Sequence, residues 1–196
     1  ERCRPEEIAA AITDQTVTIL YLPWPQGQLR LAETVAVGRQ HGIPVVVDGA
    51  GKLDNPENLR ALIAAGADLV AYSGGKYIRG PQASGFVAGR RDLIAAIAWQ
   101  HLDMDAVQEV WTAPRELLGV EQMPFMPRQG IGRGYKAGKE EIVGLITALR
   151  LYVKRDHAAE RARCTQQVQT IVDGLAGIPH VHAEVVGEVV EQHGHG

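Results

Sequence analysis

The stretch Asp68-Leu-Val-Ala-Tyr-Ser-Gly-Gly-Lys76 decides the fold class of this chain. The apolar and aromatic residues after Asp68 predict a buried strand. Ser73 ends that strand, and two glycines then turn the chain and present Lys76. Because glycine has no Cβ, such a turn lets the backbone come close to a ligand. Lys76 is therefore the first candidate for a functional side chain.

A second apolar strand lies earlier in the chain, at Pro44-Val-Val-Val-Asp48. Its three consecutive valines predict burial on both faces, as in a parallel sheet. A helix predicted from Pro56 to Gly66 connects the two strands, and such strand–helix–strand units are right-handed. Asp48 and the segment from Ser73 to Lys76 are therefore expected at the same carboxyl edge of neighbouring strands, where open α/β sheets bind ligands.

The remaining elements extend this α/β pattern. Because residues 80–85 are too few for a crossover helix, the next strand should run antiparallel to its predecessor. The irregular segment 102–134 is interpreted as the crossing from a large lobe, residues 1–125, to a linker helix and part of a small lobe, residues 126–196. Further strands are expected at 16–22, 86–89 and 181–186, and further helices at 5–13, 28–41, 91–101, 140–155 and 156–175.

An aspartate and a lysine at the ends of neighbouring strands fit a pyridoxal-phosphate site. A lysine that bonds to this cofactor must lose its proton, which a desolvated site favours. An aspartate facing the pyridine nitrogen keeps that nitrogen protonated and makes the ring a better electron sink. The Ser73 hydroxyl and the N–H groups of the turn can bind phosphate. Taken singly, Lys76 could be an ordinary exposed lysine and Asp48 an ordinary turn cap.

Composition excludes several other classes of protein. With 45% hydrophobic and 22% charged residues, the 196-residue chain is expected to fold. Its net charge of −3, without a block of like charge, gives no sign of a nucleic-acid or anionic-membrane surface. No run of about 18 apolar residues predicts a membrane span. Two cysteines far apart in sequence, Cys3 and Cys164, suit the reducing cytoplasm.

Two other kinds of site are disfavoured. The pairs Gly51-Lys52, Gly75-Lys76 and Gly138-Lys139 lack both the earlier glycine and the following Ser or Thr of a phosphate-binding loop, so a nucleotide triphosphatase is not expected. The seven histidines are scattered, without carboxylates or cysteines at ligand spacing, so no metal site is expected.

The sequence from Val45 to Ile94 resembles the selenocysteine-synthase-like family of pyridoxal-phosphate enzymes, and so does the stretch from Gly130 to Asp156. This family has the fold type I, aspartate-aminotransferase-like fold. It includes L-seryl-tRNA(Sec) selenium transferase and D-glucosaminate-6-phosphate ammonia-lyase. The pattern SGGK-x-x-x-GPQ-x-x-G at residues 73–85 is its specific part. The resemblance implies a three-layer, mostly parallel sheet in a partial pyridoxal-phosphate-binding large domain, residues 1–125, with part of a smaller C-terminal α+β lobe.

The resemblance also implies roles for single residues. Lys76 matches the lysine that forms the Schiff base with the cofactor, and Asp48 matches the partner of the pyridine nitrogen. Ser73 matches the serine that contacts the phosphate, and Ala50 the small residue under the ring. Arg79 and Arg133 are candidates for binding an anionic substrate group or a phosphate, with a surface or dimer-interface position as the alternative for each.

Two further residues, Gln82 and Gly51, refine this assignment. Gln82 is interpreted as a turn residue. Gly51 stands where class V aminotransferases and desulfurases often carry glutamine, which disfavours a desulfurase.

Members of the family also carry a substantial part before the position of Glu1 and a complete small lobe. We therefore expect a fragment of a longer protein or a chain that has lost its cofactor site, with exposed apolar surface and assembly into a homodimer or higher homo-oligomer. The leading hypothesis is a cytoplasmic lyase that removes an α-proton from a small amino acid or amino-sugar acid and eliminates a group from it. A selenium transferase on seryl-tRNA, a class V aminotransferase-like enzyme and a truncated non-catalytic domain are the alternatives. Binding of tRNA is not expected from the balanced charge.

Overall fold

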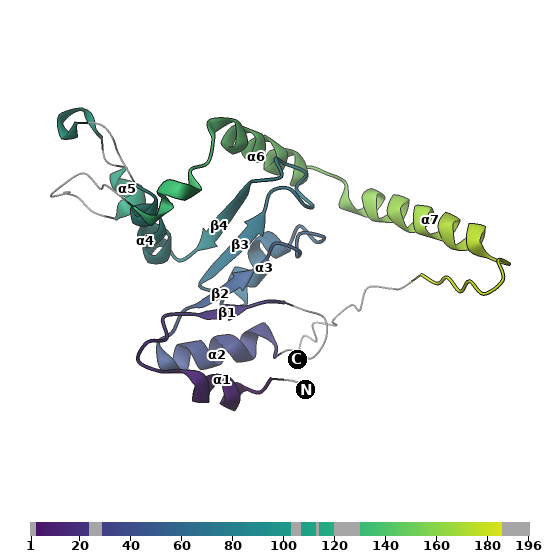
Figure 1. Cartoon of the computed structure of the whole chain (residues 1–196), viewed down its shortest axis with the longest axis horizontal. Coiled ribbons are helices and arrows are strands. Elements are labelled where there is room, and N and C mark those ends of the chain that lie inside the picture. The colour runs from purple at the N-terminus through teal and green to yellow at the C-terminus, as the bar shows by residue number, and fades with distance from the viewer. Residues whose placement is uncertain (1–2, 24–28, 103–106, 113, 120–129, 186–196) are drawn as a thin grey trace. The chain divides into compact units, whose positions relative to one another are not determined.

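The computed structural model describes residues 3–23, 29–102, 107–112, 114–119 and 130–185 (Figure 1). The chain divides into two compact units, residues 1–153 and 154–196. The expected boundary between the large and small lobes, at residues 125 and 126, lies outside the described residues, so that division stays a prediction. None of the described helices is long and apolar enough to cross a membrane.

In its described residues, the first unit is built on a four-stranded sheet in the order β1-β2-β3-β4. Its strands are β1 (Ile19–Tyr21), β2 (Val45–Asp48), β3 (Leu69–Ser73) and β4 (Gly85–Gly89). The first three strands are parallel, and β4 runs antiparallel to β3, as the short connection predicted. The carboxyl ends of β2 and β3 therefore lie at one edge of the sheet.

The helix expected at 91–101 has the expected bounds, the other expected helices of this unit are shorter than expected, and a short helix at 115–118 was not expected. Glu33 begins α2 by accepting the backbone N–H of Arg30 at 2.9 Å, and Gly42 ends it in the left-handed conformation, with φ of 69°. The α-helices are α1 (Pro5–Ala11), α2 (Leu31–His41), α3 (Asn58–Ala64), α4 (Arg91–His101), α5 (Arg115–Leu118) and α6 (Lys139–Tyr152). Two short 3-10 turns, η1 (Gln108–Val110) and η2 (Ile131–Tyr135), lie in the segment expected to be irregular.

The core lies on one face of the sheet. Alternate residues of the central strands point to this face and are almost fully buried, namely Val45, Val47, Val70 and Tyr72. They share one cluster with Val35 of α2 and with Leu59, Leu62 and Ile63 of α3. Each buried valine contributes about 1.5–3 kcal/mol relative to an exposed one, so this packing fixes the register of β2 and β3.

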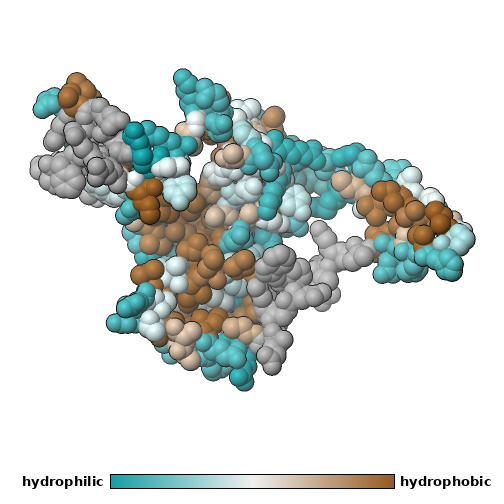
Figure 2. All heavy atoms as spheres, viewed as in Figure 1, coloured by the Kyte–Doolittle hydropathy of each residue, from teal (hydrophilic) through white to brown (hydrophobic). Residues whose placement is uncertain are grey.

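The opposite face of the sheet is only partly covered. Helix α4 lies against part of it, leaving an apolar groove between Val46 and Leu69 of the strands and Leu93 and Ile97 of the helix. Leu20, on this face, is 62% exposed. Apolar surface gathers around the strands in Figure 2. The expected exposed apolar surface is thus present in the described part of the chain.

Asp68 fastens the sheet at the edge opposite the carboxyl ends of β2 and β3. Its Oδ2 accepts the backbone N–H of Val45 at 2.8 Å, and its Oδ1 accepts Nη1 of Arg90 at 2.9 Å. Arg90 also pairs with the carboxylate of Asp92. One carboxylate therefore holds the start of β2 against the segment that follows β4.

The second unit contains the helix α7 (His157–Leu175), close to its expected bounds. Asp156 caps it by accepting the N–H of Ala159 at 2.9 Å. The strand expected at 181–186 was a wrong prediction over 181–185, which form no strand, and residue 186 lies outside the described residues. A strand needs a partner for its backbone groups, and in the described part of the chain none pairs with this segment.

Candidate functional site

Asp48 is the last residue of β2, and a hydrogen bond fixes the orientation of its carboxylate. Its Oδ1 accepts the backbone N–H of Ala50 at 3.0 Å, which closes a small turn over Gly49. The Gly49 N–H in turn donates to the Ala71 carbonyl at 2.8 Å, tying this turn to β3. Within the described residues, Oδ2 of Asp48 carries no hydrogen bond, and the side chain is exposed. The turn therefore orients Asp48 and leaves one oxygen for a ligand.

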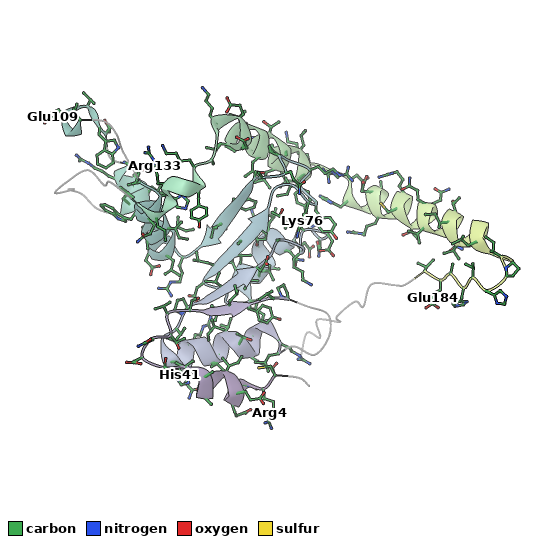
Figure 3. All side chains as sticks on the ribbon, viewed as in Figure 1. Arg4, His41, Lys76, Glu109, Arg133 and Glu184 are labelled. Atoms are coloured by element: carbon green, nitrogen blue, oxygen red, sulfur yellow. The ribbon has the colours of Figure 1, made fainter. Side chains whose placement is uncertain are left out.

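Lys76 lies in a loop that is closed by backbone hydrogen bonds. The Gly74 N–H donates to the Ser84 carbonyl at 2.8 Å, and the Gly80 N–H donates to the Gly74 carbonyl at 2.8 Å. Figure 3 shows Lys76 in this loop, beyond the carboxyl end of β3. The backbone that carries the lysine is thus held from both sides.

The glycines before Lys76 are required by the loop itself. A Cβ on Gly75 would lie 2.8 Å from Cα and 3.0 Å from the carbonyl oxygen of Gln82. A Cβ on Gly74 would lie 2.7 Å from Leu145 Cδ1 of α6. The sequence pattern indicated close approach of a ligand. The structure adds a second reason for glycine at these positions, which is the packing of the loop against itself and against α6.

The strand register places Asp48 and Ser73 on the same face of the sheet. Asp48 lies opposite Ala71, and Ser73 comes two residues later on the same strand, so all three point to one side. This is the face that the described helices leave partly open. The aspartate and the serine, from two neighbouring strands, therefore lie at one edge and on one face, with the lysine loop directly after the serine.

The two candidate arginines lie in different places. Arg79 is three residues after Lys76 and adopts a left-handed backbone with φ of 62°, while its N–H donates to the Lys76 carbonyl at 2.9 Å. Arg133 belongs to η2, which packs on the end of α4, since a Cβ on Gly132 would lie 2.6 Å from Cα of His101. Figure 3 shows Arg133 well apart from Lys76. Of the two, the structure brings only Arg79 into the lysine loop.

These residues fit the polar groups of pyridoxal phosphate on one side. Asp48 offers a free carboxylate oxygen, Ser73 a hydroxyl with no hydrogen bond in the described part of the chain, and Ala50 a small side chain between them in sequence. The expected desolvation of the lysine is not provided by the described residues, because Lys76 is exposed. In the described part of the chain, the two loops form one wall of a candidate site.

The side chain of Tyr72, the residue before Ser73 in β3, is buried. The Tyr72 ring is 3% exposed and stacks on Phe86 with 5.0 Å between ring centroids, while its hydroxyl donates to the Asn58 carbonyl at 2.8 Å. Burial raises the pKa of this phenol above its ordinary value of 10.0.

In the described residues, no group of three His, Cys, Asp or Glu side chains could hold a metal ion.

Comparison with known proteins identifies relatives of this chain. The family model "L-seryl-tRNA selenium transferase" matches residues 26–106, which include both strand ends and the lysine loop. The chain is 30% identical over 183 residues to the D-glucosaminate-6-phosphate ammonia lyase of Salmonella typhimurium, covering 91% of this chain and 40% of that protein. The resemblance to the selenocysteine-synthase-like family is confirmed.

Two further relatives agree. The chain is 33% identical over 179 residues to a 5'-C-glycyluridine monooxygenase-decarboxylase of Streptomyces sp, covering 87% of this chain and 37% of that protein. A solved structure of D-glucosaminate-6-phosphate ammonia-lyase superposes with a TM-score of 0.59 and 28% identity, over 90% of this chain and 39% of that chain. The chain thus spans about 40% of the length of the relatives it matches.

These matches also confirm the predicted fold class. The mostly parallel sheet, with its antiparallel fourth strand, is part of the fold type I, pyridoxal-phosphate transferase-like fold. The ammonia-lyase and the selenium transferases are pyridoxal-phosphate enzymes. The expected cofactor is therefore confirmed for the relatives of this chain. The roles of the single residues in this chain are proposals.

Sequence reasoning missed two features of this edge. The left-handed backbone of Arg79 has no signal in a non-glycine residue. A hydrogen bond from Tyr152 of α6 to the carbonyl of Leu53 joins residues 99 positions apart. The one hint of it in the sequence is an aromatic hydroxyl at the end of the otherwise aliphatic stripe of the helix expected at 140–155.

Proposed function

We propose that this chain supplies the lysine-bearing wall of a pyridoxal-phosphate-dependent lyase that acts on a small amino acid or amino-sugar acid. The observation that carries the proposal is the placement of Asp48 and Ser73 on one face, at the carboxyl ends of neighbouring parallel strands, with Lys76 in the loop that follows. Similarity to D-glucosaminate-6-phosphate ammonia lyase, in sequence and in structure, supports a lyase.

Each residue has a distinct part in holding the cofactor. Lys76 Nζ would bond to it, Oδ2 of Asp48 would accept a hydrogen bond from its protonated ring nitrogen, and the Ser73 hydroxyl would donate to its phosphate. Ala50 leaves room for the ring. When bound, the cofactor takes up the electron pair that remains after an α-proton is removed. Lys76 Nζ would be the base that accepts that proton and the acid that delivers it to the group that leaves.

Arg79 is the proposed contact for an anionic group of the substrate. Its side chain is exposed, and the hydrogen bond from its N–H to the Lys76 carbonyl fixes its backbone relative to the lysine. An arginine can pair with a carboxylate or phosphate through two parallel hydrogen bonds. Arg133 is proposed as a second anion contact, although in the described structure it lies on η2 rather than in the lysine loop.

Chemical trapping tests the cofactor site without requiring turnover. The chain is incubated with pyridoxal phosphate, reduced with borohydride and digested, and the modified lysine is located by mass spectrometry. We expect one principal adduct, at Lys76, which Lys76→Ala abolishes. Lys52→Ala is the matched control, because Lys52 lies in the neighbouring loop after β2 and should leave the adduct unchanged. An adduct spread over several lysines, or one that persists in Lys76→Ala, refutes the proposal.

Asp48→Asn tests the ring-nitrogen partner in the same assay. A hydrogen bond to a charged group contributes about 1.5–3 kcal/mol, so the concentration of cofactor needed for half-maximal trapping should rise about tenfold or more. The variant keeps an oxygen that can accept the Ala50 N–H, so the turn itself should persist. Unchanged trapping would remove Asp48 from the site.

Selenium transfer on seryl-tRNA is the second candidate, favoured by the family model that matches residues 26–106. It requires a surface that binds tRNA, which the net charge of −3 does not favour. Filter binding with tRNA at several salt concentrations separates the two candidates. Affinity that falls steeply with salt supports the transferase, and absence of binding supports a small-molecule substrate. A class V aminotransferase-like enzyme predicts transamination products in place of elimination.

A structural role without catalysis predicts a cooperatively folded chain that forms no adduct at Lys76. Assembly into a homodimer or higher homo-oligomer is proposed from the exposed apolar face of the sheet, and sedimentation equilibrium measures it. A cytoplasmic location is proposed from the cysteines, since Cys3 and Cys164 are both unpaired and exposed.

A further inference from the structure

Helix α6 packs across the loop that carries Lys76. A Cβ on Gly80 would lie 3.2 Å from Ala148 Cβ, and a Cβ on Gly144 would lie 2.7 Å from Pro81 Cγ. Ile78, two residues after the lysine, is 1% exposed and belongs to the same buried cluster as Ala148 and Tyr152. The position of the lysine loop is therefore set by the surface of α6.

The same helix is tied to the loop that follows Asp48. Tyr152, its last residue, is fully buried and donates its hydroxyl proton to the Leu53 carbonyl at 2.7 Å. Leu53 is itself 2% exposed and comes five residues after Asp48. A buried carbonyl that lost this donor would have no water to replace it, so the loop would have to move.

We propose that Tyr152 is a positioning residue of the cofactor site, which acts by holding α6 as a brace between the Asp48 loop and the Lys76 loop. The inference rests on the proposed function, because it assigns Tyr152 an effect on those two side chains and no contact with cofactor or substrate. Asp48 and Lys76 come from different strands, so their spacing depends on what packs against both of their loops. Helix α6 contacts both.

Two tyrosine variants test the brace. Tyr152→Phe removes the hydroxyl and keeps the ring. Tyr72→Phe is the matched control, because it removes a similar bond from a buried tyrosine to a backbone carbonyl, that of Asn58, without touching α6. Adduct formation at Lys76 should need about fivefold to tenfold more cofactor in Tyr152→Phe, the factor that corresponds to one lost hydrogen bond. Tyr72→Phe should need no more than wild type.

A double-mutant cycle with Asp48→Asn separates positioning from general loss of stability. If Tyr152 acts through the Asp48 loop, Asp48→Asn with Tyr152→Phe should lose little more affinity than Asp48→Asn alone. If Tyr152 had only a general effect on stability, the double variant would lose affinity by the sum of the two single losses. Hydrogen exchange gives a readout that needs no cofactor: the amides of Ala50 and Gly74 should both lose protection in Tyr152→Phe and keep it in Tyr72→Phe.

The outcomes distinguish the two proposals. Absence of a wild-type adduct at Lys76 overturns the proposed function, while equal adducts and equal amide protection in the two tyrosine variants overturn the brace alone. If Tyr152→Phe does not fold, Gly144→Ala pushes α6 away from Pro81 and should weaken the adduct in the same way. Gly174→Ala is its control, because a Cβ at this helical glycine of α7 meets no atom within 4 Å. Equal adducts in these two glycine variants would likewise overturn the brace.

Discussion

Replacing Gly75 by alanine should damage both the stability of the first unit and its lysine loop. The new Cβ would lie 2.8 Å from Cα and 3.0 Å from the carbonyl oxygen of Gln82, so the backbone must shift to admit it. Overpacking of this kind costs about 1–3 kcal/mol, and the lower entropy of the unfolded alanine chain returns about 0.4–1 kcal/mol. We expect a net loss of about 1–2 kcal/mol in the free energy of unfolding.

Thermal unfolding followed by circular dichroism measures this loss. For a unit of this size it lowers Tm by about 2–8 °C. The displacement of the Gly75 backbone also moves Lys76, the next residue. Trapping of pyridoxal phosphate should therefore fall by about tenfold or more. Gly51→Ala is the matched control, because a Cβ at Gly51 in the neighbouring loop meets nothing within 4 Å. Identical Tm and trapping in the two variants would refute the packing argument.

Other perturbations have equally definite outcomes. Asp68→Asn weakens the hold on the buried start of β2 and on Arg90, so the urea midpoint should fall by an amount equivalent to about 1–3 kcal/mol, with an unchanged m value. Arg79→Gly relieves a left-handed backbone and should change the free energy of unfolding by about 0 to +1 kcal/mol, while binding of phosphoserine weakens in a titration. The pKa of Tyr72 is raised by burial, so its contribution to stability is complete below its unfolded value of 10.0 and is lost as pH rises through the folded pKa. In Tyr72→Phe the loss of stability above that pH, measured by urea unfolding, should be smaller.

The strand ends and their order were predictable because they follow from local patterns. Three valines before Asp48 indicated a strand buried on both faces, and the helix between the two strands made them parallel. The short connection before Phe86 made the fourth strand antiparallel. The positions of Asp48, Ser73 and Lys76 at one edge follow from these rules alone.

The features that escaped prediction depend on contacts or conformations that leave no periodic signal. The bond from Tyr152 to Leu53 spans 99 residues, and no local pattern specifies such a pair. The left-handed backbone of Arg79 is imposed by closure of its loop. The strand expected at 181–186 was wrong over its described part because β-branched residues alone do not make a strand without a partner.

The bond between Tyr152 and Leu53 also has a consequence for the order of events during synthesis. Among the described strands β4 is the last, and it ends at Gly89, while the residue proposed to brace the cofactor edge comes 63 residues later, at position 152. At about 5–20 residues per second, a ribosome needs about 3–13 s to cover that interval. For those seconds the growing chain carries Asp48 and Lys76 without the tyrosine that braces their loops, a window in which a chaperone, or the cofactor itself, can influence folding.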